Sequence, residues 1–451
     1  MFAHTGDNNG PQSAGAVREL YSRLKTEFPG ALVRPADLND IALAVEEIRD
    51  TLPVVTQEIG DSWIHGAGSD PQKMSQYRAL LRLRKSWTGR ARETANRWLI
   101  QIPEHTWGLD YKTYLKDYEH FAREEFEAVR SQPAYQKMER SWEEQRGYLT
   151  SLTAELSEKE RLQAQRAMEE YKREPVDVSL YRRVPDPAQV QRKNGWEIGF
   201  DESGAVSQLA VGRKKLADPR HRLGVFRYEI FSRRETDRFC SQYVDCSRFP
   251  ELAPLAVDDF NKLGAEKAVS AYRSCGARLS ALYETEEGYL ALLTADEELA
   301  ETYGCPKRMA LEVRMAEKEL QLDFIWWEKA ATRVPEGLWL GMNPLASGAR
   351  IQKLGRPVDP LDVVRFGGRA LHGTDWGVQY EGMSVETLDT ALVGIGEPSL
   401  WNFTGEQPDP AGGIWFNLCN NMWNTNFPLW YGQDSRFRFI LRIENYVKHT
   451  K

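Results

Sequence analysis

Leu320-Gln-Leu-Asp-Phe-Ile-Trp326 alternates apolar and polar side chains, as does Leu311-Glu-Val-Arg-Met315 just before it. In an extended strand successive side chains point to opposite faces, so this alternation predicts β-strands with one buried face. The same period of two recurs in Trp196-Glu-Ile-Gly-Phe200 and Val225-Phe-Arg-Tyr-Glu-Ile-Phe231. Together these segments predict a large sheet structure in the second half of the chain.

Turn-forming residues lie between the predicted strands. Asp201-Glu-Ser-Gly204 and Glu284-Thr-Glu-Glu-Gly288 combine acidic residues with a glycine, which predicts hairpin turns between antiparallel strands. We therefore expect residues 177–451 to form one large antiparallel β-sandwich. Arg436 and Arg438 lie in or beside a late strand and are expected on its outer face.

Upstream of the sandwich the pattern becomes helical. Asp70-Pro71 predicts the start of a helix that runs to about Ala95, because Asp caps a helix and Pro suits its first turn. Residues 110–173 are highly charged and nearly free of glycine, which predicts long antiparallel helices. The simplest arrangement is a three-helix bundle over residues 71–176. Arg78, Arg82, Arg84 and Lys85 are expected to face solvent, and an anion-facing side is the alternative.

The N-terminal region predicts a short α/β segment. Helices are expected over Ala16–Glu27 and Ala36–Thr51, with short strands at Leu32-Val33 and Pro53–Glu58. The second helix carries an apolar stripe that we expect in a core, formed by Leu38, Ile41, Ala42, Val45 and Ile48. The predicted fold is thus multidomain α+β: an α/β remnant over 1–70, the helical bundle, and the β-sandwich.

Composition and charge limit the classes of partner that the protein is expected to bind. The net charge is −7, and 59 basic residues are dispersed among 66 acidic ones, so the sequence predicts no nucleic-acid partner. It contains no apolar run of membrane-spanning length and no export signal at its start, which predicts a soluble protein with no membrane partner. The 14 tryptophans and 18 tyrosines suit the binding of flat sugar faces, and equally suit a large sandwich core.

The segment Asp61-Ser-Trp-Ile-His-Gly-Ala-Gly-Ser-Asp-Pro71 places carboxylates, an indole and an imidazole among small residues. Carboxylates and imidazole can bind hydroxyls or a metal, the indole can stack on a sugar ring, and glycines let the backbone approach a ligand. The alternative is a polar loop anchored by a tryptophan before a helix. Two segments of similar character flank it, Gly6-Asp-Asn-Asn-Gly-Pro11 and Pro103-Glu-His-Thr-Trp-Gly-Leu-Asp110.

A fourth segment, residues 415–431, mixes five asparagines and one threonine with six aromatic residues. Asparagine amides both donate to and accept from hydroxyls, and aromatic rings stack, so this segment predicts a sugar-contacting loop. Polar turns beside core aromatic residues are the alternative.

The order of these parts resembles the glycoside hydrolase family 38 α-mannosidases. It is more similar still to an uncharacterised microbial glycoside-hydrolase-like family related to them, through Gly6–Pro11, Glu58–Gly66, Pro103–Gly108 and Asn421–Phe427. In the mannosidases a zinc ion is held by a His-x-Asp pair, by the nucleophilic aspartate and by a histidine of the helical bundle. The resemblance implies that His105 takes the place of that histidine, Asp7 that of the general acid/base, and Trp63 that of the sugar platform.

The sequence differs from the mannosidases in the residues that carry their catalytic chemistry. It has no His-x-Asp, and the half-domain that would carry this pair and the nucleophile is absent. Glycosidases use two carboxyl groups, about 5 to 5.5 Å apart when they retain the anomeric configuration and about 6.5 to 9.5 Å apart when they invert it. Asp7 supplies one, and the other candidates are Asp61, Glu104, Asp70 and Asp110. Helix capping is the alternative for the aspartates, most of all for Asp70 and Asp110, which directly precede helices. We therefore expect an N-terminally truncated glycoside hydrolase with an incomplete active site.

The remaining candidates are assigned to binding an oligosaccharide or polysaccharide. They are Asn8, Asn9, Trp63, His65, Trp107, Asn421, Trp423, Asn424 and Asn426. His105 is the candidate zinc ligand, and a structural imidazole held by Glu104 is its alternative. Two other functions stay open: a non-catalytic carbohydrate-binding protein, and a structural protein whose aromatic clusters pack the bundle against the sandwich.

Overall fold

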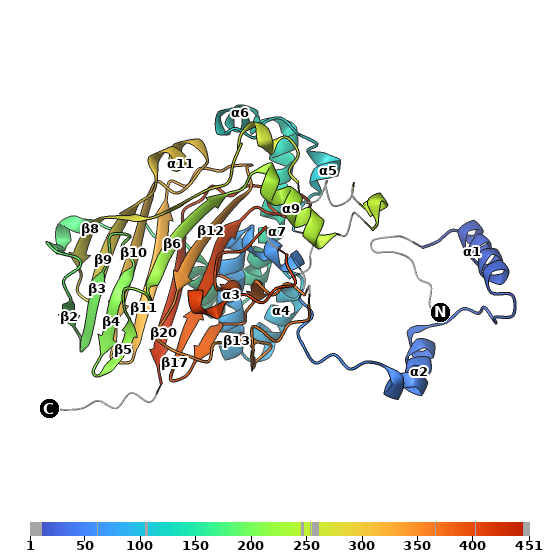
Figure 1. Ribbon diagram of the computed structural model, residues 1–451, viewed down its shortest axis with the longest axis horizontal. Helices are drawn as coiled ribbons and strands as arrows, with labels where there is room; N and C mark the ends of the chain where they lie inside the picture. The colour runs from blue at the N-terminus through green and yellow to red at the C-terminus, as the bar shows by residue number, and fades with distance from the viewer. Residues whose placement is uncertain are drawn as a thin grey trace. The chain divides into compact units, whose positions relative to one another are not determined.

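The computed structural model describes residues 11–60, 62–103, 107–244, 248–252, 254, 261–365, 367–401 and 403–444 (Figure 1). The chain divides into two compact units, Met1–Gln57 and Glu58–Lys451, which we describe separately as the N-terminal unit and the main unit. Among the described residues, no helix combines the length and the apolar character needed to cross a membrane.

Over its described residues, 11–57, the N-terminal unit has two helices, α1 (Ala14–Glu27) and α2 (Leu38–Ile48), and one 3-10 turn, η1 (Arg49–Thr51). Asp37 caps α2 by accepting hydrogen bonds from the backbone N–H groups of Asn39 and Asp40. The expected strands at residues 32–33 and 53–58 do not form; only Glu58, at the start of the main unit, makes an isolated bridge.

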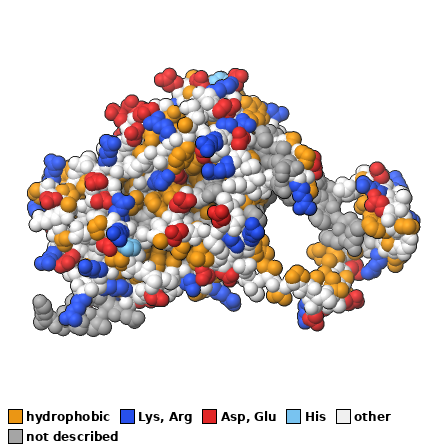
Figure 2. Space-filling model, in the orientation of Figure 1, with side chains coloured by type: hydrophobic (Ala, Val, Ile, Leu, Met, Phe, Trp, Pro, Cys, Tyr) orange, Lys and Arg blue, Asp and Glu red, His pale blue; other side chains and the backbone are white. Residues whose placement is uncertain are grey.

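The apolar stripe of α2 was expected in a core, and this expectation is wrong for the described structure. Neither α1 nor α2 contains a buried residue, and Leu38 is 79% exposed. Figure 2 shows hydrophobic side chains at the surface of this unit. Helical periodicity thus predicted the helix itself. It did not predict that the apolar side chains of the helix are exposed among the described residues.

The main unit is built on two antiparallel sheets (Figure 1). The first has the strand order β1-β8-β9-β10-β11-β20-β17-β16-β13-β14. Its strands are β1 (Arg182–Arg183), β8 (Arg278–Glu284), β9 (Gly288–Thr294), β10 (Arg308–Met315), β11 (Glu319–Trp327), β20 (Ser435–Ile443), β17 (Met383–Thr387), β16 (Gly377–Tyr380), β13 (Arg350–Lys353) and β14 (Arg356–Val358).

The second sheet has the order β15-β18-β19-β12-β6-β4-β3-β2, with β5 paired to β4 and β7 paired to β6. Its strands are β15 (Leu371–Gly373), β18 (Leu392–Ile395), β19 (Ile414–Asn420), β12 (Glu336–Met342), β6 (Leu223–Ile230), β4 (Val206–Val211), β3 (Trp196–Phe200), β2 (Gln191–Lys193), β5 (Lys214–Ala217) and β7 (Arg273–Gly276). The strands predicted from period-two alternation all form.

The inner faces of the two sheets share one core. Phe226 of β6 stacks on Phe324 of β11 with ring centroids 5.1 Å apart, and Phe416 of β19 contacts Phe439 of β20 at 4.8 Å. Such contacts between alternating residues of facing sheets define a sandwich. The expected turns form too: Asp201 to Gly204 connect β3 to β4, where Gly204 has a positive φ of 76°.

Four helices of the main unit share a second core, so the expected three-helix bundle needs correction. They are α3 (Pro71–Ser86), α4 (Gly89–Leu99), α7 (Pro133–Ala154) and α8 (Glu158–Glu169). The helix expected to run from Pro71 to about Ala95 breaks at Trp87 and Thr88, whose backbones are extended, and α4 begins at Gly89, which has a positive φ of 53°. The other helical segments are η2 (Ser62–Gly68), α5 (Tyr111–Tyr114), α6 (Arg123–Val129), η3 (Val178–Leu180), α9 (Arg233–Tyr243), η4 (Pro250–Leu252), η5 (Ala265–Lys267), α11 (Glu297–Thr302) and η6 (Pro410–Gly412).

Charged side chains that were expected in solvent tie α3 to the sandwich instead. Arg78 is buried, and its guanidinium donates hydrogen bonds to four backbone carbonyls, at residues 374, 375, 387 and 388. Arg438 of β20 is also buried, in a two-point ion pair with Asp389. The same carboxylate accepts a 2.7 Å hydrogen bond from the Ser75 hydroxyl of α3. The helices and the sandwich are therefore joined by satisfied buried polar groups.

Candidate functional site

The 3-10 segment η2 carries the sequence cluster that suggested a sugar pocket, and it packs on the end of β19. The Asn420 side-chain amide donates a 2.9 Å hydrogen bond to the backbone carbonyl of His65. A Cβ at Gly66 would lie 2.2 Å from the Phe427 ring, and one at Gly68 would lie 2.4 Å from the Asn417 and Asn420 side chains. These glycines therefore allow close approach to the protein's own side chains.

One side of η2 borders a cavity of about 280 Å³ that we call the aromatic pocket. Segments far apart in the sequence meet here: η2, the first turns of α3, the chain after α4, and the loop between β19 and β20. The lining residues are Trp63, Ile64, Ala67, Met74, Tyr77, Ile102, Pro103, Trp107 and Phe427. The fold thus brings together three of the four segments that the sequence singled out separately.

Trp63 is the accessible ring of the aromatic pocket. It is 39% exposed, whereas Trp107, Trp423 and Phe427 are buried. Its ring centroid lies 4.1 Å from that of Trp423 and 5.6 Å from that of Phe427, which in turn lies 5.5 Å from Trp107. The buried rings hold Trp63 from behind, so that one aromatic surface is presented in a fixed position.

A buried lysine supports the same pocket. The Lys73 Nζ lies 3.9 Å from the centroid of the Trp107 ring, which is the geometry of a cation–π contact. Lys73 stands in the first turn of α3, whose N-terminus is capped by Asp70, and Asp70 forms a two-point ion pair with Arg146 at 2.8 and 2.9 Å. One face of Trp107 is therefore occupied by the protein itself.

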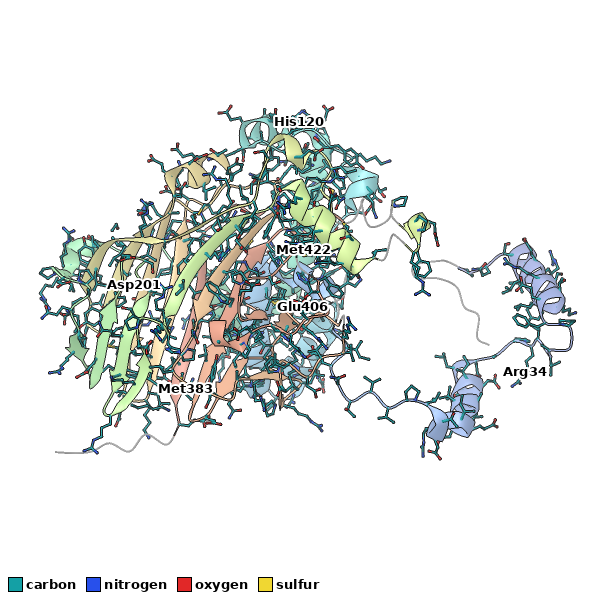
Figure 3. The ribbon with its side chains drawn as sticks, viewed as in Figure 1. Arg34, His120, Asp201, Met383, Glu406 and Met422 are labelled. Carbon is teal, nitrogen blue, oxygen red and sulfur yellow. The ribbon has the colours of Figure 1, made fainter. Side chains whose placement is uncertain are left out.

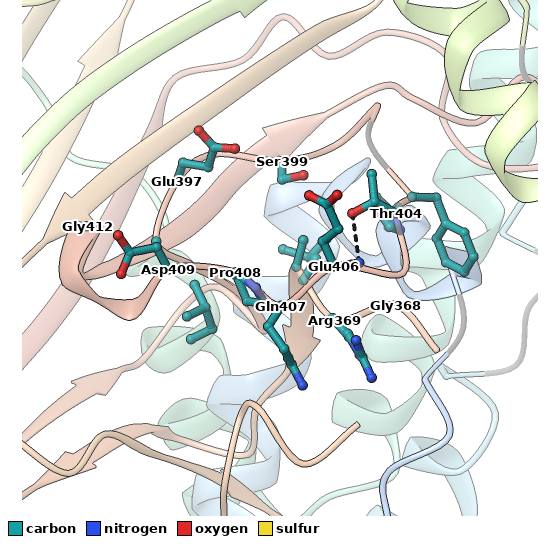
Figure 4. Close-up of a pocket in the computed structure, with 16 residues that line it drawn as sticks. Gly368, Arg369, Glu397, Ser399, Thr404, Glu406, Gln407, Pro408, Asp409 and Gly412 are labelled. Atoms are coloured by element: carbon teal, nitrogen blue, oxygen red, sulfur yellow. Dashed lines mark hydrogen bonds between the residues drawn. The ribbon is translucent and has the colours of Figure 1, made fainter. Parts of the chain in front are cut away.

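His65, on the same segment, borders a second cavity of about 380 Å³ that we call the polar pocket (Figure 4). Most of its wall comes from the loop between β18 and β19, on which Glu406 is labelled in Figure 3. Its polar side chains belong to His65, Arg369, Glu397, Ser399, Thr404, Glu406, Gln407 and Asp409. In Figure 4 the Glu406 carboxylate and the Ser399 and Thr404 hydroxyls point toward the same part of the pocket.

A group of three charged or ionisable side chains lies beside the polar pocket. Lys353 forms an ion pair with Glu58 and lies 3.0 Å from Nδ1 of His372. The His372 Nε2 lies 3.0 Å from the carbonyl of Arg369, and its Nδ1 faces both the Lys353 ammonium and the Glu58 carboxylate, the latter at 3.5 Å. Burial acts to raise the pKa of Glu58, but hydrogen bonds with His372 and Lys353 outweigh it and lower that pKa to about 2.

The structure places the predicted site residues in three groups. Trp63, Trp107 and Trp423 come together at the aromatic pocket, and His65 borders the polar pocket. The candidates Asp7, Asn8, Asn9, Asp61, Glu104 and His105 lie outside the described residues. Their assigned roles stay predictions.

The asparagines of the loop after β19 are used for packing. Asn421 is buried, its amide nitrogen donates to three backbone carbonyls, and its oxygen accepts from the Glu336 backbone N–H. Asn424 is buried as well, and the side-chain oxygen of Asn426 accepts from the Thr425 hydroxyl. The geometry of Asn421 thus gives no support to a direct sugar contact.

A zinc site cannot be assembled from the part of the chain that the structure describes. No group of three or more His, Cys, Asp or Glu side chains in that part is arranged to hold a metal ion. The proposed ligand His105 lies outside it, so we assign no chemical step to a metal.

Sequence reasoning missed several residues that build the two pockets. Tyr77 and Met74 were overlooked because a helix of mixed polarity gives no sign of facing a cavity. The polar pocket was missed although its loop, Gly396–Gly413, is rich in glycine, proline and acidic residues. That composition is typical of a polar surface loop and could have marked it as a candidate.

Comparison with known protein families gives one match. The family described as "Domain of unknown function (DUF5054)" matches residues 67–322, more than half of the chain. The chain belongs to the DUF5054 family. The matched region contains Lys73, Tyr77 and Trp107, and it ends before the polar-pocket loop. The family description names no activity.

Other comparisons add little to this. No curated protein matches the sequence. One solved structure, of a protein from Escherichia coli K12 described as a "Putative aldose 1-epimerase", is similar at 11% sequence identity and a TM-score of 0.25, over 56% of this chain and 98% of the other. So low a TM-score supports no conclusion about fold or ligand.

Proposed function

We propose that this member of the DUF5054 family binds carbohydrate at the aromatic pocket, with Trp63 as the ring on which a sugar stacks. The observation that carries the proposal is the accessible Trp63 ring, held in place by Trp423 and Phe427 at the mouth of a cavity. A rigid aromatic surface suits the apolar face of a pyranose. The pocket volume of about 280 Å³ suits a single sugar unit of a longer chain.

Tyr77 supplies a polar group at this pocket. Tyr77 belongs to the lining, and burial raises the pKa of its hydroxyl, so the hydroxyl stays protonated at neutral pH. A protonated hydroxyl both donates a hydrogen bond and accepts one, which matches a sugar hydroxyl. Stacking on Trp63 and one hydrogen bond to Tyr77 together define an oriented subsite.

In its finer form, the proposal makes the protein a glycoside hydrolase. Asp61 and Glu104, two and three positions before Trp63 and Trp107 in the sequence, and Asp7 are the carboxyl groups that it would use. One carboxylic acid would give its proton to the leaving glycosidic oxygen, and a second carboxylate would attack the anomeric carbon or take a proton from water. The mannosidase resemblance suggests this chemistry, and His105 remains the proposed zinc ligand.

The binding test uses two variants of similar exposure. Trp63→Ala removes the accessible ring, and Tyr114→Ala on α5 removes a ring that is 40% exposed outside the pocket. Titration calorimetry against a panel of neutral oligosaccharides should show a fall in affinity of about tenfold or more for Trp63→Ala, equivalent to about 1.4 kcal/mol, and no change for Tyr114→Ala. Trp63→Phe should fall between them.

A packing role is the competing function, and the burial of Trp107, Trp423 and Phe427 favours it. It predicts that Trp63→Ala lowers the unfolding midpoint while any saccharide affinity stays unchanged, and this outcome would refute the binding proposal. Tyr77→Phe is a second probe, because it should weaken saccharide binding without loss of stability.

Hydrolysis is tested separately with aryl glycosides and natural oligosaccharides, alongside metal analysis of the purified chain. Turnover abolished by Asp61→Asn or Glu104→Gln would support the hydrolase form. Saccharide binding without turnover would leave a carbohydrate-binding protein. Stoichiometric zinc lost on His105→Ala would support the metal assignment.

A further inference from the structure

We infer that the polar pocket is a second binding site, which takes the ammonium group of an amino sugar. The sugar part of this ligand class rests on the carbohydrate-binding function proposed above. The ammonium part rests on the charges, the unpartnered groups and the fixed walls of the polar pocket.

The charge of the polar pocket favours a cation. Its lining contains the carboxylates of Glu397, Glu406 and Asp409 and a single guanidinium, that of Arg369. Within the described residues, the carboxylates of Glu397 and Glu406 form neither hydrogen bonds nor ion pairs; both residues are exposed, and Glu397 interacts electrostatically with Arg227. One Asp409 oxygen caps η6 by accepting from the Ala411 backbone N–H. The pocket therefore keeps an excess of negative charge and free acceptor oxygens.

A buried hydroxyl without a partner is a second, independent sign of a ligand. Ser399 is 7% exposed, and its Oγ has no hydrogen-bond partner in the described structure. A buried polar group that forms no hydrogen bond is destabilising, and native proteins rarely keep one. The hydroxyl lies in the wall of the polar pocket and points toward the same region as the Glu406 carboxylate (Figure 4). A bound hydroxyl or ammonium group would satisfy it.

The walls of the pocket are fixed before any ligand enters. Arg369 donates to the Val363 carbonyl through Nε and Nη2, at 3.2 and 3.0 Å, and to the Gly405 carbonyl through Nη1 at 2.6 Å. It therefore ties the loop that carries Glu406 to the segment before β15. Gly412 packs against Gly396 so closely that a Cβ at Gly412 would lie 1.9 Å from the Gly396 carbonyl oxygen. Such preorganisation lowers the entropic penalty of binding.

The side chains that line the polar pocket favour an organic cation over a metal ion. The described residues hold no cluster of three ligating side chains that could surround a metal ion. Carboxylates spread around a cavity of about 380 Å³ suit a larger ligand that presents hydrogen-bond donors in several directions. An ammonium group supplies three donors and a positive charge, and sugar hydroxyls supply the rest.

The test compares glucosamine with glucose, which differ in an ammonium group in place of one hydroxyl. Binding to the full chain is measured by ligand-observed NMR in the millimolar range. Glucosamine should bind several-fold more tightly than glucose, and added salt should weaken it. Glu406→Gln and Glu397→Gln, which remove charge but keep shape, should each weaken glucosamine binding. Glu144→Gln, at an exposed position of α7 outside the pocket, should not.

Ser399→Ala separates a ligand-binding hydroxyl from a structural one. Because this hydroxyl has no partner, its removal should leave the thermal midpoint of the unliganded protein unchanged or higher, while glucosamine binding falls. Equal binding of glucose and glucosamine, absence of glucosamine binding, or retention of affinity in the Glu397→Gln/Glu406→Gln double variant would each overturn the inference.

The same measurements distinguish this inference from the proposed function. Trp63→Ala should leave the preference for glucosamine over glucose intact, because Trp63 does not line the polar pocket. If Trp63→Ala leaves neutral-oligosaccharide binding unchanged, the proposed function fails, whereas the preference for the ammonium ligand is decided by the glutamate variants alone.

Discussion

Helices α2 and α3 belong to different compact units. In each, the burial of the side chains differs from what their polarity predicts, and the two differences have opposite direction. Helix α2, in the N-terminal unit, has a complete capping box and an apolar stripe, yet none of its residues is buried. Helix α3, in the main unit, is rich in arginine and lysine, yet Lys73 and Arg78 on it are buried. Both helices form where their caps predict.

This contrast separates two kinds of information in a sequence. Caps and periodicity describe the local backbone, and they predicted a helix where α2 forms and the start of α3, though not the end of α3. Burial depends on which surface covers the helix, and for Arg78 that surface is a set of four backbone carbonyls in the sandwich. A guanidinium has five donors in a fixed plane, so it can be buried when acceptors surround it.

The largest effect is expected where the main unit depends on a buried charge. Arg438→Ala removes both hydrogen bonds from the guanidinium to Asp389 and leaves a buried carboxylate without its counter-charge. We expect a loss of about 3–5 kcal/mol in the free energy of unfolding, measured by urea denaturation.

A neighbouring arginine on the same strand serves as the control. Arg442 of β20 also pairs with two carboxylates, those of Glu319 and Glu386, but its side chain is exposed. Arg442→Ala should therefore change stability by less than about 1 kcal/mol. If Arg442→Ala were as destabilising as Arg438→Ala, burial would not be the cause of the Arg438 effect. The argument that the main unit depends on buried charged groups would then fail.

The next effect concerns two glycines that lie in helical segments of the main unit and should respond with opposite sign. Gly66→Ala in η2 would place a Cβ 2.2 Å from the Phe427 ring, and Gly147→Ala in α7 would meet nothing within 4 Å. We expect Gly66→Ala to destabilise by about 1–3 kcal/mol through overpacking and Gly147→Ala to stabilise by up to about 1 kcal/mol. Thermal unfolding measures both, and stabilisation by Gly66→Ala would show that η2 is loosely packed.

Much of the sandwich could be predicted because its signals are local. The alternation in Trp196–Phe200 and Leu320–Trp326 and the turn at Asp201–Gly204 each specify backbone geometry within a few residues. The break between α3 and α4 was missed although Gly89, with a positive φ of 53°, directly follows it and glycine is unfavourable inside a helix. The burial of Arg78 was missed because its acceptors are about 300 positions away in the sequence.

The residues of the candidate site also divide into those with a local signal in the sequence and those whose role depends on distant partners. Trp63 and Trp107 could be selected because aromatic residues among polar and small ones are unusual, and the fold does bring them to one pocket. The use of Asn421 could not be foreseen, because its partners are the backbone carbonyls of three separate segments. Ser399 gave no signal at all, because only the structure shows that its buried hydroxyl lacks a partner.

A smaller effect is expected at Glu58, the first residue of the main unit, and it depends on pH. The pKa of Glu58 is lowered from 4.5 to about 2 in the folded protein. Its ionised form therefore contributes stability that is present above pH 4.5 and lost as the pH falls toward 2. Glu58→Gln should cost about 1 kcal/mol at pH 6, after allowance for partial exposure, and the difference from the unmodified protein should shrink as the pH falls toward 2.

Urea titrations of both proteins across this pH range measure the difference. Lys353→Met removes the counter-charge and should also lower the free energy of unfolding, because it leaves the carboxylate beside His372 without its cation. A stability difference between Glu58→Gln and the unmodified protein that stays constant down to pH 2 would show that the carboxylate is not held in its ionised form.

The smallest effect on global stability is expected in the N-terminal unit. Asp37→Ala removes the cap of α2, which should cost that helix about 1 kcal/mol and speed hydrogen exchange over Leu38–Ile48 in the full chain. The urea midpoint of the main unit should not move. Leu38→Ala, at a position that is 79% exposed, should change neither quantity by more than about 0.5 kcal/mol. A larger loss from Leu38→Ala would mean that the apolar stripe of α2 is covered in solution, which would restore the burial that its periodicity predicted.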